Sequence, residues 1–130
     1  MNMKRVLLVD DLPTWRNLFK TLLNLSFKDV EIQECASQEG ALQSLENHIF
    51  DLAILDLCLI DKSRHNVQGL VLMREVKAKS PITKVILTTA YPKQLGEKYL
   101  EADAFILKAQ LPDFLDINLF HETVDRLLNP

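Results

Sequence analysis

Five short segments of strand character recur along the chain, and this repetition limits the folds available to it more than any other feature. Four of them, at residues 6–9, 52–55, 85–87 and 105–107, are apolar runs bounded by polar or turn residues. Such runs predict buried strands. The fifth, VEIQE from Val30, alternates apolar and polar residues, so we expect it at one edge of the sheet.

Segments with helical periodicity follow these runs. Pro13 suits the first turn of one helix and Ser37 is a candidate N-cap of the next, while the others follow Gly69, Pro92 and the last strand. Alternation of strands and helices predicts a parallel sheet covered on both faces, here as one α/β domain over residues 1–130. The apolar faces comprise Trp15, Leu18, Phe19, Leu22 and Leu23; Ala41, Leu42, Leu45 and Ile49; Leu72, Met73 and Val76; Leu95, Tyr99 and Leu100; and Ile117, Phe120, Val124, Leu127 and Leu128.

The composition excludes several classes of protein. Lys and Arg number 15 against 18 Asp and Glu, giving a formal charge of -3, so no basic excess predicts nucleic-acid binding. Cys35 and Cys58 match neither a metal-binding spacing nor a disulfide framework. The run at 6–9 is too short for a signal-peptide core, and no stretch approaches a membrane span. We therefore expect a cytoplasmic protein with neither nucleic-acid nor membrane partners.

Polar side chains follow the predicted central strands at the edge where parallel sheets carry their functional groups. Taken singly, each has an ordinary explanation as a helix-end, turn, strand or surface residue. Their shared position at one sheet edge instead predicts a site. These residues are Asp10 and Asp11 after the first strand, Asp56 after the third, Thr88, Thr89 and Ala90 at the end of the fourth, and Lys108 after the fifth.

The three acids require a counter-charge if they converge. Two carboxylates about 4 Å apart repel by roughly 4 kcal/mol at an effective dielectric near 20. Hard oxygen ligands without histidine or thiolate favour Mg²⁺ or Mn²⁺, and Mg²⁺ commonly shares its carboxylates with a phosphate oxygen. Lys108 adds an ammonium and Thr89 a hydroxyl donor, so the set suits an incoming phosphoryl group.

Four stretches, VLLVDDLPTWRNLF, DLAILDLCL, PITKVILTTAY and ADAFILKA, occur in an order that resembles the receiver domain of bacterial two-component response regulators. The resemblance covers essentially the whole chain. It implies a flavodoxin-like, doubly wound (βα)5 fold with strand order 2-1-3-4-5. It also implies a phosphoacceptor switch in signal transduction, not an enzyme.

The resemblance assigns roles to matching residues. Asp56 would accept a phosphoryl group from the phosphohistidine of a histidine kinase or histidine phosphotransfer protein. Asp11 would bind the metal directly and Asp10 chiefly through water, and the backbone carbonyl of Cys58 would be a further ligand. Lys108 would pair with the phosphoryl group.

The family's switch would use a threonine and an aromatic residue. Because the family places a small residue after its threonine, Thr89 followed by Ala90 is chosen, which leaves Thr88 a core position. Thr89, Ala90 and Lys108 would bind the phosphoryl group. Movement of Thr89 would let Phe105 rotate inward and change the surface of the fourth helix, fifth strand and fifth helix. The receiver would be a monomer or a phosphorylation-dependent dimer, acting on an output partner that the sequence does not identify.

Two departures from the family pattern stand beside the site. Ala109 replaces the proline that usually follows the lysine in a cis peptide bond. A cis bond to alanine costs about 2.5–4 kcal/mol, so the direction of the Lys108 side chain is in question. The loop at 59–68 is about five residues longer than usual.

Trp15, early in the first helix, could contact a phosphodonor or pack in the core.

Three other functions compete with this interpretation. A pseudo-receiver would use the same fold as a docking module without phosphorylation, but the acids and the lysine are all retained. A phosphatase using an aspartyl phosphate would need an acid where Leu12 stands. A nucleotide-binding module would need a glycine-rich phosphate loop, and none follows the first strand.

Overall fold

The computed structural model describes residues 3–56, 68–89, 101–108 and 117–130, and a parallel sheet forms its centre. Its order is β2-β1-β3-β4-β5, which confirms the predicted topology and the edge position of the alternating strand. Every adjacent pair of strands is parallel. The strands are β1 (Lys4–Val9), β2 (Val30–Cys35), β3 (Leu52–Asp56), β4 (Lys84–Thr89) and β5 (Ala104–Leu107).

The described helices begin where local chemistry favours a start. Pro13 occupies the first turn of α1, where its missing N–H costs no hydrogen bond. Ser37 caps α2, because its hydroxyl accepts a hydrogen bond from the backbone N–H of Gly40 at 3.1 Å. The helices are α1 (Pro13–Ser26), α2 (Gln38–Asn47), α3 (Gln68–Lys79) and α4 (Ile117–Leu128).

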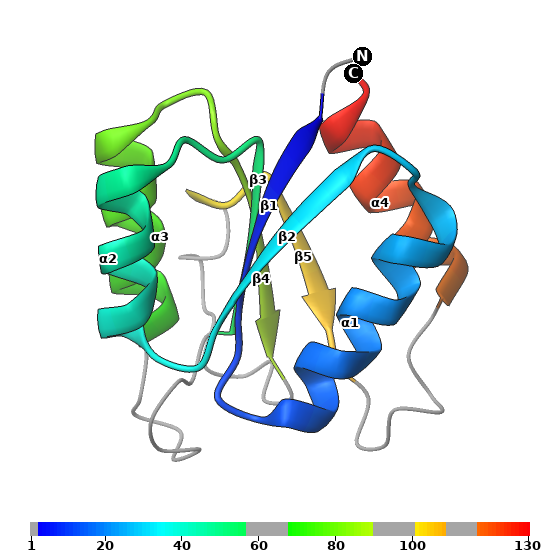
Figure 1. The fold of residues 1–130 in the computed structure, drawn as a ribbon, viewed down its shortest axis with the longest axis horizontal. Coiled ribbons are helices and arrows are strands. Elements are labelled where there is room, and N and C mark those ends of the chain that lie inside the picture. The colour runs from blue at the N-terminus through cyan, green and yellow to red at the C-terminus, as the bar shows by residue number, and fades with distance from the viewer. Residues whose placement is uncertain (1–2, 57–67, 90–100, 109–116) are drawn as a thin grey trace.

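The helices cover both faces of the sheet, with α1 and α4 on one face and α2 and α3 on the other (Figure 1). Successive side chains of a strand point to opposite faces, so β1 divides its residues between two cores. Leu7 and Val9 pack in the core beneath α2 and α3. Val6 and Leu8 pack in the core beneath α1 and α4, together with Trp15.

Two details of the predicted helices differ from the structure or lie outside it. Ile49 was expected on the apolar face of the second helix, but α2 ends at Asn47 and Ile49 is 69% exposed. The helix expected after Pro92 lies outside the described residues, so α4 is the helix predicted around Phe120. None of the helices in the described ranges combines the length and the hydropathy needed to cross a bilayer.

A half-buried ion pair joins elements at the end of the sheet opposite to the strands' carboxyl ends. Asp103, just before β5, accepts hydrogen bonds from the backbone N–H of Val85 at 2.8 Å and from Lys77 Nζ at 2.5 Å. Lys77 also donates to the carbonyl of Thr83 at 2.9 Å. Burial raises the pKa of Asp103, but its hydrogen bonds and the charge of Lys77 outweigh burial and hold that pKa below its usual range.

Asp103→Asn should therefore destabilise the fold in a pH-dependent way. A carboxyl with a lowered folded-state pKa stabilises the protein above its unfolded-state pKa, and this contribution is lost as the pH falls through the folded-state value. We expect the variant to lose about 1 kcal/mol of unfolding free energy near neutral pH. Urea unfolding should show this difference shrinking in acid.

The matched control is Glu101→Gln, which removes a carboxylate from the exposed ion pair with Arg74. Exposed pairs contribute little, so its unfolding free energy should stay closer to that of the original chain. A deficit in Asp103→Asn that is constant from neutral to acid pH would contradict the assigned role of the Asp103 charge.

Candidate functional site

The register of the central strands places two of the predicted acids side by side. Val9 of β1 lies opposite Leu55 of β3, so the residues that follow them, Asp10 and Asp56, stand at the same level at the carboxyl ends of the strands. Both carboxylates are almost fully buried, with 1% and 2% exposure. Two carboxylates at the ends of apolar strands are therefore shielded from solvent.

Asp11 completes a cluster of three carboxylates. Asp10, Asp11 and Asp56 each offer an oxygen, and these oxygens lie within 4.8 Å of one another. Asp11 is half-buried, whereas the other two are buried. The structure therefore brings together the acids that the sequence predicted to meet.

Lys108 points into this cluster. Its Nζ forms an ion pair with Asp10 Oδ2 and lies 3.5 Å from Asp56 Oδ2. The backbone N–H of Lys108 donates to the carbonyl of Thr89 at 2.7 Å, which bonds the backbone of Lys108 to the end of β4. A buried ammonium is tolerated only when it is paired, and here the acids pair with it. The side chain of Lys108 therefore points toward the acids. The missing proline at position 109 had put this direction in question.

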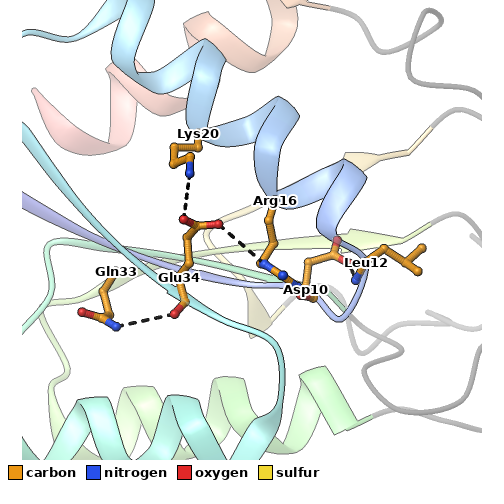
Figure 2. A network of polar contacts seen from close by, with 6 residues as sticks. All are labelled: Asp10, Leu12, Arg16, Lys20, Gln33 and Glu34. Atoms are coloured by element: carbon orange, nitrogen blue, oxygen red, sulfur yellow. Dashed lines mark hydrogen bonds and ion pairs between the residues drawn. The ribbon is translucent and has the colours of Figure 1, made fainter.

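Asp10 is held from several directions besides its bond to the lysine. Its Oδ1 accepts a hydrogen bond from the backbone N–H of Leu12 at 3.0 Å, and its own N–H donates to the carbonyl of Cys35 at 3.1 Å. Arg16 Nη1 donates to the carbonyl of Asp10 at 2.7 Å (Figure 2). These bonds fix both the backbone and the side chain at the start of the site.

Arg16 links the site to the edge strand through Glu34. Arg16 Nε lies 3.6 Å from Glu34 Oε1, and Lys20 Nζ lies 2.9 Å from Glu34 Oε2 (Figure 2). The network joins α1, β2 and the end of β1. The sequence analysis missed it, because charges at positions 16, 20 and 34 have no spacing that predicts their meeting.

Trp15 packs in the core and also contacts the lysine. Its side chain belongs to the core beneath α1 and α4 and is 8% exposed, which favours the packing alternative for this residue. Lys108 Nζ lies 5.0 Å from the centre of its ring. That contact was not predicted, and the only sequence signal for it was an aromatic residue in the first turn of the helix that follows the two acids.

The two threonines at the end of β4 differ in their surroundings, although both are 1% exposed. Thr88 lies opposite Asp56, and its hydroxyl donates to the carbonyl of Leu55 at 3.4 Å. Thr89 is the next residue, so its side chain points to the opposite face of the sheet. By the same alternation Phe105 shares that face, where it is half-buried against the core beneath α2 and α3.

Several predicted features lie outside the described residues. They are the carbonyl of Cys58, the small residue Ala90, the bond between Lys108 and Ala109, and the long loop at 59–68 as far as residue 67. Gln68, the last residue assigned to that loop, is the first residue of α3. The roles suggested for the others stay predictions.

The described acids fit a hard divalent cation. Carboxylate oxygens are the ligands that Mg²⁺ and Mn²⁺ prefer, and the cluster contains no histidine or cysteine. Among the described residues, Lys108 pairs with Asp10 and lies near Asp56, and its single charge does not balance three carboxylates, so an additional positive charge would relieve repulsion among them. Asp10, Asp11 and Asp56 are the described residues that could hold such an ion.

Comparisons with known proteins identify the family of this chain. The family described as "Response regulator receiver domain" matches residues 6–116. The sensory transduction protein LytR of Staphylococcus epidermidis is 34% identical over 105 residues, which are 80% of this chain and 40% of LytR. The chemotaxis protein CheY of Listeria monocytogenes is 26% identical over 113 residues, 87% of this chain and 85% of that protein. The chain thus spans less than half the length of LytR.

Solved structures extend the likeness to the fold. The response regulator TrrA of Thermotoga maritima, crystallised in complex with Mg²⁺-BeF, is 31% identical with a TM-score of 0.79, covering 97% of this chain and 100% of TrrA. A receiver domain protein of Methanospirillum hungatei is 28% identical with a TM-score of 0.74, covering 97% and 94%. The family match spans most of the chain, and we conclude that the chain belongs to the response regulator receiver domain family of two-component signalling.

Proposed function

We propose that residues 1–130 act as one phosphorelay receiver domain in which Asp56 accepts a phosphoryl group from a histidine kinase or a histidine phosphotransfer protein. The observation that carries the proposal is the convergence of Asp10, Asp11 and Asp56, with the ammonium of Lys108 paired to Asp10 and close to Asp56. A carboxylate nucleophile beside a fixed positive charge suits the formation of an acyl phosphate.

In the proposed reaction an Asp56 carboxylate oxygen attacks the phosphorus of a phosphohistidine. A phosphorus–oxygen bond forms, the phosphorus–nitrogen bond breaks, and the imidazole leaves with the bonding electron pair and takes up a proton. Lys108 lies close enough to Asp56 to pair with the transferred group and offset its charge. The product is a labile aspartyl phosphate, which suits a timed signal.

Mg²⁺ or Mn²⁺ is the cofactor that we propose for this transfer. Asp11 would hold it directly, Asp10 chiefly through water, and Asp56 and the carbonyl of Cys58 would supply further ligands. When bound, the ion would neutralise charge on the acids and on the phosphoryl oxygens. The support from the described residues is an all-oxygen donor set and an excess of negative charge that Lys108 alone does not balance.

We propose Thr89, not Thr88, as the switch threonine, with Ala90 and Lys108 completing the phosphate site. Thr88 points to the opposite face of the sheet from Phe105, and its hydroxyl donates to the carbonyl of Leu55. Thr89 and Phe105 lie on one face of neighbouring strands, so a shift of the threonine would change the space open to the aromatic ring. This arrangement supports the pairing of these two residues in one switch.

The proposed output surface includes β5 and α4. Leu107 of β5 and Ile117 and Leu119 of α4 are exposed by about half of their surface. Exposed aliphatic side chains suit contact with a protein partner or a second copy of the domain. The helix expected after Pro92 would contribute to the same surface. The receiver would work as a monomer or as a phosphorylation-dependent dimer, and its cytoplasmic location stays a prediction.

Asp56→Asn should abolish acyl phosphate formation, because the amide removes the nucleophile while keeping the shape of the side chain. The original chain, incubated with Mg²⁺ and a small-molecule acyl phosphate, should gain the mass of one phosphoryl group in intact-protein mass spectrometry. Asp103→Asn, at the other end of the sheet, is the control and should still be labelled. Label in Asp56→Asn would identify the wrong acceptor, and no label in the original chain would favour the docking-module alternative.

Mg²⁺ should stabilise the folded chain, and Asp11→Asn should remove most of that effect. A ligand that binds only the folded state stabilises it by RT ln(1 + [L]/Kd), or about 1.4 kcal/mol at ten times the Kd. Without metal, Asp11→Asn should be more stable than the original chain by about 1 kcal/mol of unfolding free energy, because one charge of the repelling cluster is gone. It should therefore unfold at a higher temperature.

Thermal unfolding with and without Mg²⁺ measures both effects, and the exposed acid Asp29 supplies the control variant Asp29→Asn. That control should keep the full Mg²⁺ response. An identical Mg²⁺ response in Asp11→Asn would argue that the ion binds elsewhere on the chain.

A further inference from the structure

The ammonium of Lys108 is enclosed by groups of two different kinds. Asp10 and Asp56 supply carboxylate oxygens, and Trp15 supplies the face of an indole ring 5.0 Å from Nζ. Lys108 has only 4% of its surface exposed, so water contributes little to its solvation. The ring therefore forms a substantial part of the ammonium's surroundings.

The indole packs in the core beneath α1 and α4, where it also belongs to a column of aromatic rings. Trp15 and Phe19 lie on successive turns of α1, with ring centres 5.6 Å apart. Phe19 stacks in turn on Phe120 of α4, at 5.3 Å between ring centres and 21° between ring planes. Phe19 and Phe120 are buried to within 1% of their surface. Close packing of this kind holds side chains in single rotamers, so the indole is a rigid support.

An indole face attracts a cation through its quadrupole, and tryptophan does so more strongly than tyrosine or phenylalanine. Unlike a carboxylate, the ring brings no negative charge and forms no strong hydrogen bond with the ammonium. The three N–H donors of the lysine can therefore remain directed at oxygen atoms. An incoming phosphoryl group would exchange for a carboxylate at these donors while the contact with Trp15 persists.

We infer that Trp15 is a positioning residue for Lys108, holding the ammonium over its indole face at the reach of Asp56 before and during phosphoryl transfer. The inference rests on the proposed function, because it assigns Trp15 a part in the transfer to Asp56. Trp15 belongs neither to the cluster of three acids nor to the proposed switch pair of Thr89 and Phe105.

The test compares three variants in the aromatic column. Trp15→Leu removes the π face and keeps apolar bulk, and Trp15→Phe restores a weaker π face. Phe19→Leu keeps apolar bulk beside Trp15, so the surrounding core still holds the indole against the lysine. Labelling of Asp56 by a small-molecule acyl phosphate with Mg²⁺ should be roughly three- to tenfold slower in Trp15→Leu. Trp15→Phe should recover part of the rate, and Phe19→Leu should stay within about twofold of the original chain.

A spectroscopic measurement separates positioning from general stability. Protons held over an aromatic face are shifted upfield by the ring current, so the ε-methylene protons of Lys108 should resonate upfield of the other lysines. The shift should vanish in Trp15→Leu, persist in Phe19→Leu and be assigned by its loss in Lys108→Met. Thermal unfolding of all variants reports how much stability each substitution costs.

The outcomes distinguish this inference from the proposed function. Slow labelling in Trp15→Leu, partial recovery in Trp15→Phe and an upfield Lys108 signal would support it. Equal rates in Trp15→Leu and Phe19→Leu, or an ordinary Lys108 signal in the original chain, would overturn it while Asp56 labelling still stands. If the original chain is never labelled, the proposed function fails and the transfer role of Trp15 fails with it.

Discussion

A buried ammonium shared by converging carboxylates is the interaction on which this site depends. Lys108 pairs with Asp10 and lies within 3.5 Å of Asp56, and each of the three residues is at most 4% exposed. A charge buried in this way is stable only with its partners in place. The geometry at the carboxyl ends of β1, β3 and β5 is therefore tied to the electrostatics of the site. Among the described residues, the charge of Lys108 alone does not balance the charge of the three acids.

The excess negative charge makes the acid cluster sensitive to any charged group that binds beside it. Each added positive group would lower the repulsion among Asp10, Asp11 and Asp56, whereas each added negative group requires compensation. A divalent ion and a phosphoryl group together change the local charge less than either does alone. In the function that we propose, the site would respond to the two as a pair, and that response would supply the bias that a two-state switch requires.

The sequence predicted the fold and the acids for one reason: both follow from local pattern combined with parallel topology. Apolar runs identify strands, and a residue that directly follows a strand is placed at the sheet edge without knowledge of tertiary contacts. This logic located Asp56 and Lys108 correctly. It failed at Ile49, because helical spacing continued past Asn47 although the chain leaves the helix there. The contacts of Trp15 and Arg16 depend on how α1 lies against the sheet, and no spacing encodes that.

The aim of Lys108 shows how the site tolerates its departure from the family pattern at position 109. The backbone N–H of this residue is bonded to the carbonyl of Thr89, and its ammonium is held by Asp10, Asp56 and the face of Trp15. All of these contacts come from α1 and from the carboxyl ends of β1, β3 and β4, which precede the lysine in sequence. A proline after the lysine fixes the loop that follows, but the direction of the side chain is already determined by elements packed in the core. In this chain the lysine is therefore directed at Asp10 and Asp56 with alanine at position 109, and its ion pairs and its contact with Trp15 account for that direction.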